Sequence, residues 1–428
     1  MNQFSELSLS QSIHQNLAKN SFVEPTPVQA QAIPSALTGA DVVATAQTGT
    51  GKTLAFLLPI METLLKPSKT NRKGTFGRPV RALVLSPTRE LAIQIAEIFA
   101  KLASNTGFRA AVVVGGLSEQ TQLNAIARGA ELIIATPGRL EDFLNRRLIN
   151  LSSLETLVLD EADRMLDMGF LPAIERILSI LPPARQSLFF SATMEKDVER
   201  LIARHSKSPI RIAVGSVMRA PDQIDLHVYE VENHVKAGLL RHMLTQETGS
   251  FLVFARTKHG TDRLARKLSN FGLRAIAMHG DHTQSQRIRA LAGFRQGLYR
   301  VLVATDVAAR GIHVDSVAHV VNYDLPQAPQ DFIHRVGRTG RAGQRGSAST
   351  FSLKSEWGEI RRIERECKVR LLRQEVSAEI VREANELAKS ELRSEKTAPR
   401  MLVQGRAGGE QHRASKQNKT FGSVRHKR

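Results

Sequence analysis

Short apolar runs of strand length recur along this chain, and each run ends abruptly at polar or glycine residues. The first series comprises residues 42–44, 82–85, 132–135, 157–159 and 188–190. Continuous aliphatic runs separated by helical stretches are typical of strands buried on both faces, so the series predicts a parallel α/β sheet. In such sheets ligands bind beyond the carboxyl ends of the strands, where we expect the functional residues.

The strand pattern then restarts, which predicts a second lobe. Its apolar runs comprise residues 251–254, 275–278, 301–304 and 319–322. Residues 214–222 lie between the two series and are interpreted as a linker. We predict a first lobe over residues 1–213, a second lobe over residues 223–370, and a charged helix with a basic tail over residues 371–428.

Two basic segments are expected to lack regular structure. Residues 66–80 carry five Lys or Arg among glycines and prolines, which predicts a flexible loop. Residues 396–428 carry nine Lys or Arg against one acidic residue, with almost no aliphatic periodicity. Because such a segment cannot bury enough apolar surface to offset its ordering, we expect the tail to be disordered when free.

The composition narrows the class of partner. The 428 residues carry a formal net charge of +19 and a pI of about 10.5, which favours a polyanion, either nucleic acid or an anionic membrane surface. No apolar run approaches the ~18 residues of a membrane span, and the first residues lack the features of a secretory signal. Cys367 is the only cysteine, which excludes intramolecular disulfides and a multi-cysteine zinc site. We expect a cytoplasmic protein with no membrane association.

Two motifs in the first lobe predict nucleotide hydrolysis. Gly51-Lys52-Thr53 follows a strand and opens a helix, as in a phosphate-binding loop whose Lys reaches the β and γ phosphates and whose Thr holds Mg²⁺. After the strand at 157–159, we expect Asp160 to engage Mg²⁺ and Glu161 to orient and deprotonate the attacking water. The predicted ATP-binding residues of the loop are Ala46, Gln47, Thr48, Gly49, Thr50, Gly51, Lys52 and Thr53.

The ordered series of motifs, over roughly residues 4–355, resembles the DEAD-box ATP-dependent RNA helicases of superfamily 2, most like their bacterial RhlE-like branch. The resemblance implies two RecA-like lobes of the P-loop NTPase type, which clamp single-stranded RNA and hydrolyse ATP with Mg²⁺ between them. Residues 21–29 resemble the family's Q motif, in which Gln29 reads the adenine edge and Phe22 stacks on the ring. Phe4 is the upstream aromatic, and Ser21 replaces the family's usual glycine.

The resemblance also implies how the chain binds RNA. Hydroxyls, exposed backbone N–H groups and Arg side chains hold phosphates without reading bases, so we expect backbone contacts with little sequence specificity. In the first lobe the implied residues are Pro87, Thr88, Arg89, Gly115, Gly116, Thr136, Gly138 and Arg139. In the second lobe they are Arg256, Gln284, Arg287, Thr305 and Gly311.

The remaining motifs imply communication between the lobes. Residues 191–193 resemble the segment that couples hydrolysis to strand separation, through Ser191, Thr193 and Asp163. In residues 334–341, which resemble the family's last motif, His334 pairs with the acidic motif. Arg338 and Arg341 are the implied arginine fingers, which reach the γ-phosphate across the cleft.

Three histidines depart from these patterns. His313 stands where the family usually has an aspartate that touches the ATP ribose. His279 and His282 share a predicted loop, and without a suitable carboxylate–histidine set beside them we interpret both as structural histidines.

Two other classes of protein share part of the pattern. A small-molecule kinase with a phosphate-binding loop explains Lys52 but leaves Arg338, Arg341 and the second lobe without a role. An RNA-stimulated ATPase that acts as a clamp or assembly factor shares every motif with a helicase that unwinds short duplexes or remodels RNA–protein complexes. We expect a monomer whose partner is RNA, with ribosomal precursors and the RNA-decay machinery as candidate assemblies.

Overall fold

The computed structural model describes residues 3–46, 49–67, 78–214, 224–309, 317–340 and 345–386. Most of the predicted basic loop, most of the predicted linker and the predicted disordered tail lie outside the described residues. The same holds for five residues singled out by the motifs, Gln47, Thr48, Gly311, His313 and Arg341.

The first lobe is built on a seven-stranded parallel sheet with the order β3-β4-β2-β5-β6-β1-β7. Its strands are β1 (Val42–Thr45), β2 (Ala82–Leu85), β3 (Ala110–Val113), β4 (Leu132–Ala135), β5 (Thr156–Leu159), β6 (Gln186–Ser191) and β7 (Ile210–Ala213). The five central strands coincide with the predicted apolar runs. The two outer strands were not predicted. Strand β7 lies at the sheet edge with exposed residues and is interrupted by Arg211, whereas β3 is itself a short apolar run that was missed.

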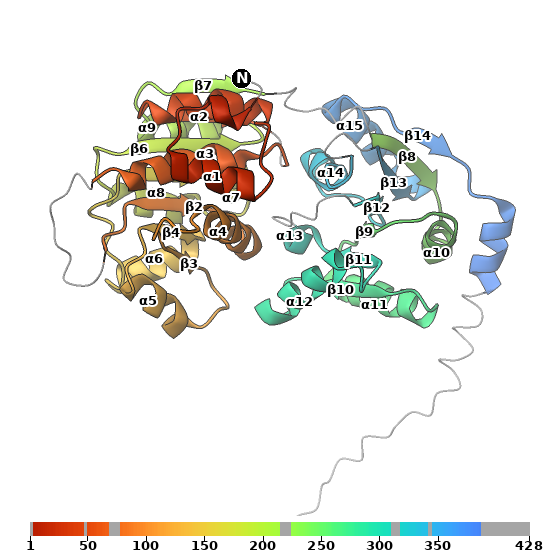
Figure 1. Cartoon of the computed structure of the whole chain (residues 1–428). Coiled ribbons are helices and arrows are strands. Elements are labelled where there is room, and N and C mark those ends of the chain that lie inside the picture. The colour runs from red at the N-terminus through yellow and green to blue at the C-terminus, as the bar shows by residue number, and fades with distance from the viewer. Residues whose placement is uncertain are drawn as a thin grey trace, which may run out of the picture.

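Helices cover both faces of this sheet (Figure 1). They are α1 (Gln11–Lys19), α2 (Pro27–Leu37), α3 (Lys52–Leu65), α4 (Arg89–Leu102), α5 (Glu119–Ala127), α6 (Pro137–Asn145), α7 (Ala162–Asp167), α8 (Leu171–Ser179) and α9 (Lys196–His205), preceded by the 3₁₀ turn η1 (Phe4–Glu6). Neighbouring strand residues enter different cores: Val42 and Ala44 pack with α3, whereas Val43 packs with α9. Alternate residues of an apolar strand thus contribute to the hydrophobic cores on the two faces of the sheet.

The second lobe repeats the architecture, with the strand order β10-β11-β9-β12-β13-β8-β14. Its strands are β8 (Ile224–Glu230), β9 (Phe251–Phe254), β10 (Ala275–Met278), β11 (Val301–Ala304), β12 (His319–Asn322), β13 (Gly346–Ser352) and β14 (Leu372–Gln374). Its helices are α10 (Lys236–Gln246), α11 (Lys258–Asn270), α12 (Gln284–Arg295), α13 (Asp306–Ala309), α14 (Pro329–Val336), the 3₁₀ turn η2 (Lys354–Glu356) and α15 (Trp357–Cys367). The prediction of two parallel-sheet lobes is confirmed.

The second lobe extends beyond the predicted boundary at residue 370. Strand β14 pairs in parallel with β8, and a helix over residues 378–386 buries Ile380 and Ala384 in the core that contains α10. The boundary was set too early because the three residues of β14 are all exposed, so this strand gives no strong sequence signal.

The two lobes lie side by side, with α12 and α13 on the part of the second lobe nearest the first (Figure 1). Within the described part of the chain, none of the helices has the length and hydrophobicity that a bilayer crossing requires.

Candidate functional site

The phosphate-binding loop joins β1 to α3, and its backbone conformation requires glycine. Gly51, the residue before α3, has a φ of +87°, and Gly49 has a φ of +88°. A Cβ atom on Gly51 would lie 2.3 Å from Nε2 of Gln29, so conformation and space both exclude a side chain there. The N-terminus of α3 therefore opens into the loop, as binding of phosphate to helix N–H groups requires.

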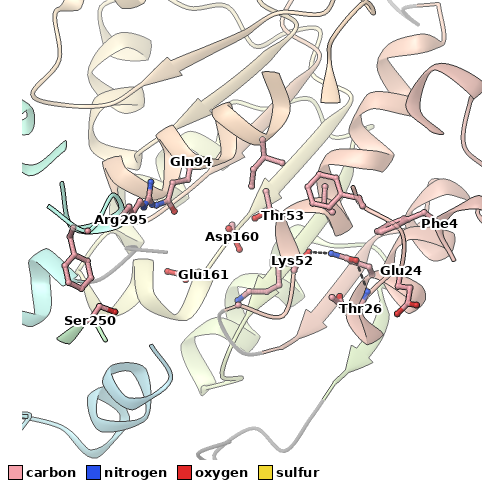
Figure 2. Close-up of a pocket in the computed structure, with 18 residues that line it drawn as sticks. Phe4, Glu24, Thr26, Lys52, Thr53, Gln94, Asp160, Glu161, Ser250 and Arg295 are labelled. Carbon is pink, nitrogen blue, oxygen red and sulfur yellow. Dashed lines mark hydrogen bonds between the residues drawn. The ribbon is translucent and has the colours of Figure 1, made fainter. Parts of the chain in front are cut away.

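A cavity of about 830 Å³ lies at this loop and is lined by both lobes (Figure 2). The residues of its wall that the motifs indicate are Phe4, Phe22, Gln29, Gly49, Gly51, Lys52, Thr53, Asp160 and Glu161. The second lobe contributes Ser250, Phe294, Arg295 and Gly297, which no motif indicates. The structure thus brings the residues predicted for the nucleotide site together from separate parts of the sequence. The rest of the cavity wall consists of second-lobe residues that belong to no sequence motif.

Four buried polar atoms of residues that line this cavity lack hydrogen-bond partners among the described residues, and two of the four belong to charged groups. The charged ones are Nζ of Lys52 and Oδ1 of Asp160, whose residues are 6% and 3% exposed; the neutral ones are Oγ1 of Thr26 and Oε1 of Gln94. Burying such groups without partners is costly, because each loses its hydration without compensation. An ammonium group fits phosphate oxygens and a carboxylate oxygen fits Mg²⁺, so Lys52, Thr53 and Asp160 have the chemistry to hold a magnesium-bound triphosphate.

We expect ATP binding in the presence of Mg²⁺ to weaken as the pH falls through about 7. Burial raises the pKa of Asp160 to about 7, the nearby Glu161 adds to this increase, and Lys52 opposes it. The protonated carboxyl group attracts Mg²⁺ less strongly, so affinity should fall by up to about tenfold per pH unit below this pKa.

The measurement is the Kd for ATP with Mg²⁺ between pH 8 and 5.5, in the wild type and in Asp160→Asn. ATP itself titrates in this range for both proteins, so the difference between the two pH profiles is the readout. Identical profiles would contradict the assignment of the titrating group to Asp160.

Glu161 is held by an arginine that no motif indicates. It has a φ of +53° at the start of α7, and its Oε2 accepts a hydrogen bond of 2.6 Å from Nη1 of Arg164. Both residues are buried, at 4% and 6% exposure, so this is a desolvated ion pair. The one available signal was their i,i+3 spacing at the start of a helix, which is too common to be specific.

Gln29, the residue predicted to bind adenine, is held at the cavity wall by two hydrogen bonds. Its Oε1 accepts from the backbone N–H of Thr26 at 2.8 Å, and its Nε2 donates to the carbonyl oxygen of Gly51 at 2.8 Å. An amide has a second N–H and a second oxygen lone pair, so these bonds leave a donor and an acceptor for an adenine edge. Ser21 has a φ of +59°, a left-handed conformation that explains why a glycine is usual there.

Asp163 joins the acidic motif to residues 191–193. Its Oδ2 accepts hydrogen bonds from the backbone N–H of Ala192 (3.0 Å) and from the backbone N–H and Oγ1 of Thr193 (2.7 and 3.1 Å). Oγ of Ser191 accepts from the backbone N–H of Asp163 at 3.2 Å and donates to the carbonyl of Thr193 at 2.7 Å. A displacement of Asp163 would therefore move the whole segment.

The two lobes meet again at the acidic motif. Arg164 of the first lobe shares a small cavity with His334 and Arg338 of the second lobe. Burial, together with the nearby positive charge of Arg164, lowers the pKa of His334 to about 4, so the ring is neutral at pH 7. Nε of Arg338 donates to the carbonyl of His334 at 3.1 Å. Arg338 lies outside the wall of the large cavity, so its predicted contact with the γ-phosphate stays a prediction.

Arg335 anchors this part of the second lobe, although no role was assigned to it from the sequence. Its guanidinium forms two bonds to Asp306, at 2.6 and 2.7 Å, and donates to Oδ1 of Asn322 at 3.1 Å. It also lies over the ring of Phe254. Because Arg335 is 2% exposed and connects α13, β12 and α14, it holds the last motif in place.

The predicted RNA-binding residues of the first lobe form two groups. Arg89 lies against the Gly115–Gly116 turn: a Cβ on Gly116 would come within 2.4 Å of Nη1 of Arg89. Next to them, buried Pro87 precedes Thr88, whose Oγ1 caps α4 by accepting from the backbone N–H of Leu91 at 3.3 Å.

The second group surrounds the start of α6. Thr136 is the residue before this helix, and a Cβ on Gly138 would meet no atom within 4 Å, so the backbone there is accessible. Nη1 of Arg139 lies 3.0 Å from Asp142 and 3.4 Å from Glu119. RNA phosphates would have to compete with these two carboxylates for Arg139.

In the second lobe, Gln284 and Arg287 bind the first lobe directly. Nε2 of Gln284 donates to Oε1 of Glu90 at 2.8 Å, and Nη2 of Arg287 lies 3.1 Å from Oε2 of the same carboxylate. Nε2 of Gln284 and Nη2 of Arg287, two donors assigned to RNA from the sequence, are therefore occupied by a buried glutamate. Of the other predicted residues, Thr305 is buried, and half-exposed Arg256 lies 3.6 Å from Glu356.

Comparison with known proteins agrees with this geometry. Residues 26–201 match the model of the DEAD/DEAH box helicase family, and residues 235–343 match the helicase conserved C-terminal domain. The DEAD-box ATP-dependent RNA helicase CshA of Streptococcus pneumoniae serotype 4 is 41% identical over 369 residues, which cover 86% of this chain and 69% of that protein.

Solved structures with the same arrangement include Mss116p bound to single-stranded RNA and AMP-PNP, with a TM-score of 0.79 and 31% identity over 90% of this chain and 81% of that chain. Saccharomyces cerevisiae Dbp5 bound to RNA and ADP BeF3 has a TM-score of 0.78 and 28% identity over 92% of this chain and 99% of that chain.

Proposed function

The chain belongs to the DEAD-box family of ATP-dependent RNA helicases, and we propose how its own residues divide the work between nucleotide and RNA. Lys52, Thr53 and Asp160 hold the phosphates and Mg²⁺, and Glu161 accepts a proton from the attacking water. Gln29 and Phe22 bind the adenine. Mg²⁺ supplies charge neutralisation at the phosphates.

The observation that carries this proposal is the pair of buried atoms without partners, Nζ of Lys52 and Oδ1 of Asp160, in a cavity that both lobes line. A ligand that spans the lobes satisfies both atoms and stabilises the arrangement in which the lobes touch. The free energy of nucleotide binding is thereby available to bring the RNA-binding segments of the two lobes together.

RNA binds, in this proposal, along the loops that follow the strands of both sheets. Arg89 with the Gly115–Gly116 turn and Arg139 with the start of α6 supply guanidinium and backbone N–H groups, which suit phosphates rather than bases. Low sequence specificity follows from this. Closure of the lobes over a bent single strand disrupts a few base pairs locally, and hydrolysis resets the open form.

A clamp or assembly factor that hydrolyses ATP without separating strands is the alternative, and it uses the same residues. The decisive experiment measures ATP turnover with and without single-stranded RNA, together with displacement of a short duplex at saturating protein. We expect RNA to stimulate turnover and ATP to be required for displacement. Stimulation without any displacement would favour the clamp, and turnover indifferent to RNA would contradict both.

Several finer features stay proposals. They are a monomeric state, a cytoplasmic location without membrane association, the RhlE-like branch, and an action on ribosomal precursors or with the RNA-decay machinery. The basic charge of the chain and its resemblance to the family support them.

A further inference from the structure

Three metal-ligating side chains converge in the second lobe, away from the nucleotide cavity. They are Asp262 on α11 and His279 and His282 in the loop between β10 and α12, with one ligand atom of each within 4.8 Å of the others. Nε2 of His279 lies 2.9 Å from Oδ2 of Asp262, and Nε2 of His282 lies 3.7 Å from Oδ1. The carboxylate missing from the local sequence is thus supplied by a neighbouring helix, which reopens the interpretation of these histidines.

An ordinary histidine–carboxylate hydrogen bond does not explain this geometry. Although Nε2 of His279 is close to Asp262, neither of its ring nitrogens makes a hydrogen bond of acceptable geometry within the described residues. His279 is 4% exposed, so water compensates it poorly. Atoms that point at a shared metal ion, rather than at one another, show this combination of short distance and poor alignment.

The spacing also suits a metal ion. Ligand atoms about 2.0–2.2 Å from a tetrahedral Zn²⁺ are about 3.3–3.6 Å apart. Nε2 of His279 lies 2.9 Å from Oδ2 of Asp262 and Nε2 of His282 lies 3.7 Å from its Oδ1, which is close to this range. The centroids of the two imidazole rings are 3.9 Å apart, and the ring planes are tilted by 41°. Lys258, the first residue of α11, is paired with Asp281.

We propose that Asp262, His279 and His282 form a binding site for one Zn²⁺-class ion. Two imidazoles and one carboxylate favour Zn²⁺ and its neighbours Co²⁺ and Ni²⁺ over Mg²⁺ and Ca²⁺, which prefer oxygen ligands only. Three protein ligands leave a fourth position for water.

The position of the site indicates what the ion does. His282 lies two residues before Gln284, which begins α12 and reaches Glu90 of the first lobe with Arg287. A bound ion joins α11 to the loop before α12 (Figure 1) and so restrains the start of α12, which contacts the first lobe. Divalent transition metals therefore stabilise the α12 side of the contact between the lobes.

The test uses the full chain, stripped with a chelator and titrated with Zn²⁺, and with Co²⁺ as a spectroscopic probe. We expect one high-affinity ion per chain, and visible Co²⁺ absorption of the intensity typical of four-coordinate sites. Asp262→Asn and His282→Gln should each weaken Zn²⁺ binding at least tenfold and abolish that absorption. His242→Gln, on α10 of the same lobe, is the matched control and should bind as the wild type does.

Hydrogen exchange of residues 279–287 gives an independent readout. Zn²⁺ should slow exchange there in the wild type and have no effect in Asp262→Asn. A melting curve of each metal-free variant verifies that it is folded. The test substitutes Asp262 and His282 because both are more exposed than the buried His279, so their substitution disturbs the fold less. Equal Zn²⁺ affinity in the wild type and in folded Asp262→Asn would overturn the proposal, as would an absence of Zn²⁺ binding to the wild type.

Discussion

The Glu161→Gln variant should bind ATP and RNA normally and lose about 10²–10⁴-fold in ATP turnover. The amide has nearly the shape of the carboxylate, and its oxygen can still accept the hydrogen bond from Arg164. It cannot take a proton from the attacking water, so only the chemical step is affected. The measurements are kcat for RNA-stimulated ATP hydrolysis and the Kd values for ATP and for single-stranded RNA.

Glu195→Gln, at an exposed position before α9, is the matched control and should leave turnover unchanged. The melting temperature of Glu161→Gln shows whether the loss of the buried charge has altered the fold. A folded variant that turns over ATP at close to the wild-type rate would remove Glu161 from the role of general base.

The Arg338→Ala variant is expected to lose about 10³–10⁵-fold in RNA-stimulated turnover, the range for an arginine finger. In the described arrangement Arg338 shares a small cavity with Arg164 and His334, beside the acidic motif of the first lobe. A modest movement of the second lobe would bring its guanidinium toward the phosphates. Because it acts on charge that develops during transfer, kcat should fall far more than ATP affinity.

Arg338→Lys separates charge from geometry: it keeps the positive charge but lacks the planar fork of a guanidinium, and we expect it to recover only part of the rate. Arg362→Ala, on the surface of α15, controls for the loss of an arginine from the same lobe. If a folded Arg338→Ala protein kept more than about a tenth of wild-type turnover, the finger would have to be another residue, with Arg341 the first candidate.

The central part of the fold was predictable because its signals are local. The apolar runs that became β1, β2, β4, β5 and β6 are buried on both faces, and burial on both faces leaves a continuous aliphatic run in the sequence itself. The outer strand β7 and the short β14 are largely exposed, so their residues are mixed and the same criterion fails; β3 has a short apolar run that was missed.

The backbone conformation of the predicted phosphate-binding loop is also a local feature. Gly51, Lys52 and Thr53 are neighbours in the chain, and the left-handed φ of Gly51 with the helix start after it is a local requirement that specific residue types record. The cavity residues of the second lobe, such as Ser250 and Phe294, line the cavity only because the two lobes pack against each other. Nothing in their own sequence neighbourhood requires those residue types.

What the sequence by itself determined is the pair of parallel sheets, the phosphate-binding loop and the acidic motif, since each depends on residues close together in the chain. Only the tertiary structure decided that Glu90 binds Gln284 and Arg287, and that Asp262 joins His279 and His282. These groups come from separate helices and loops. The distances between these side chains depend on how whole helices, strands and lobes pack. Hydrophobic periodicity indicates which face of a helix or strand is buried, but not which distant polar group that face contacts.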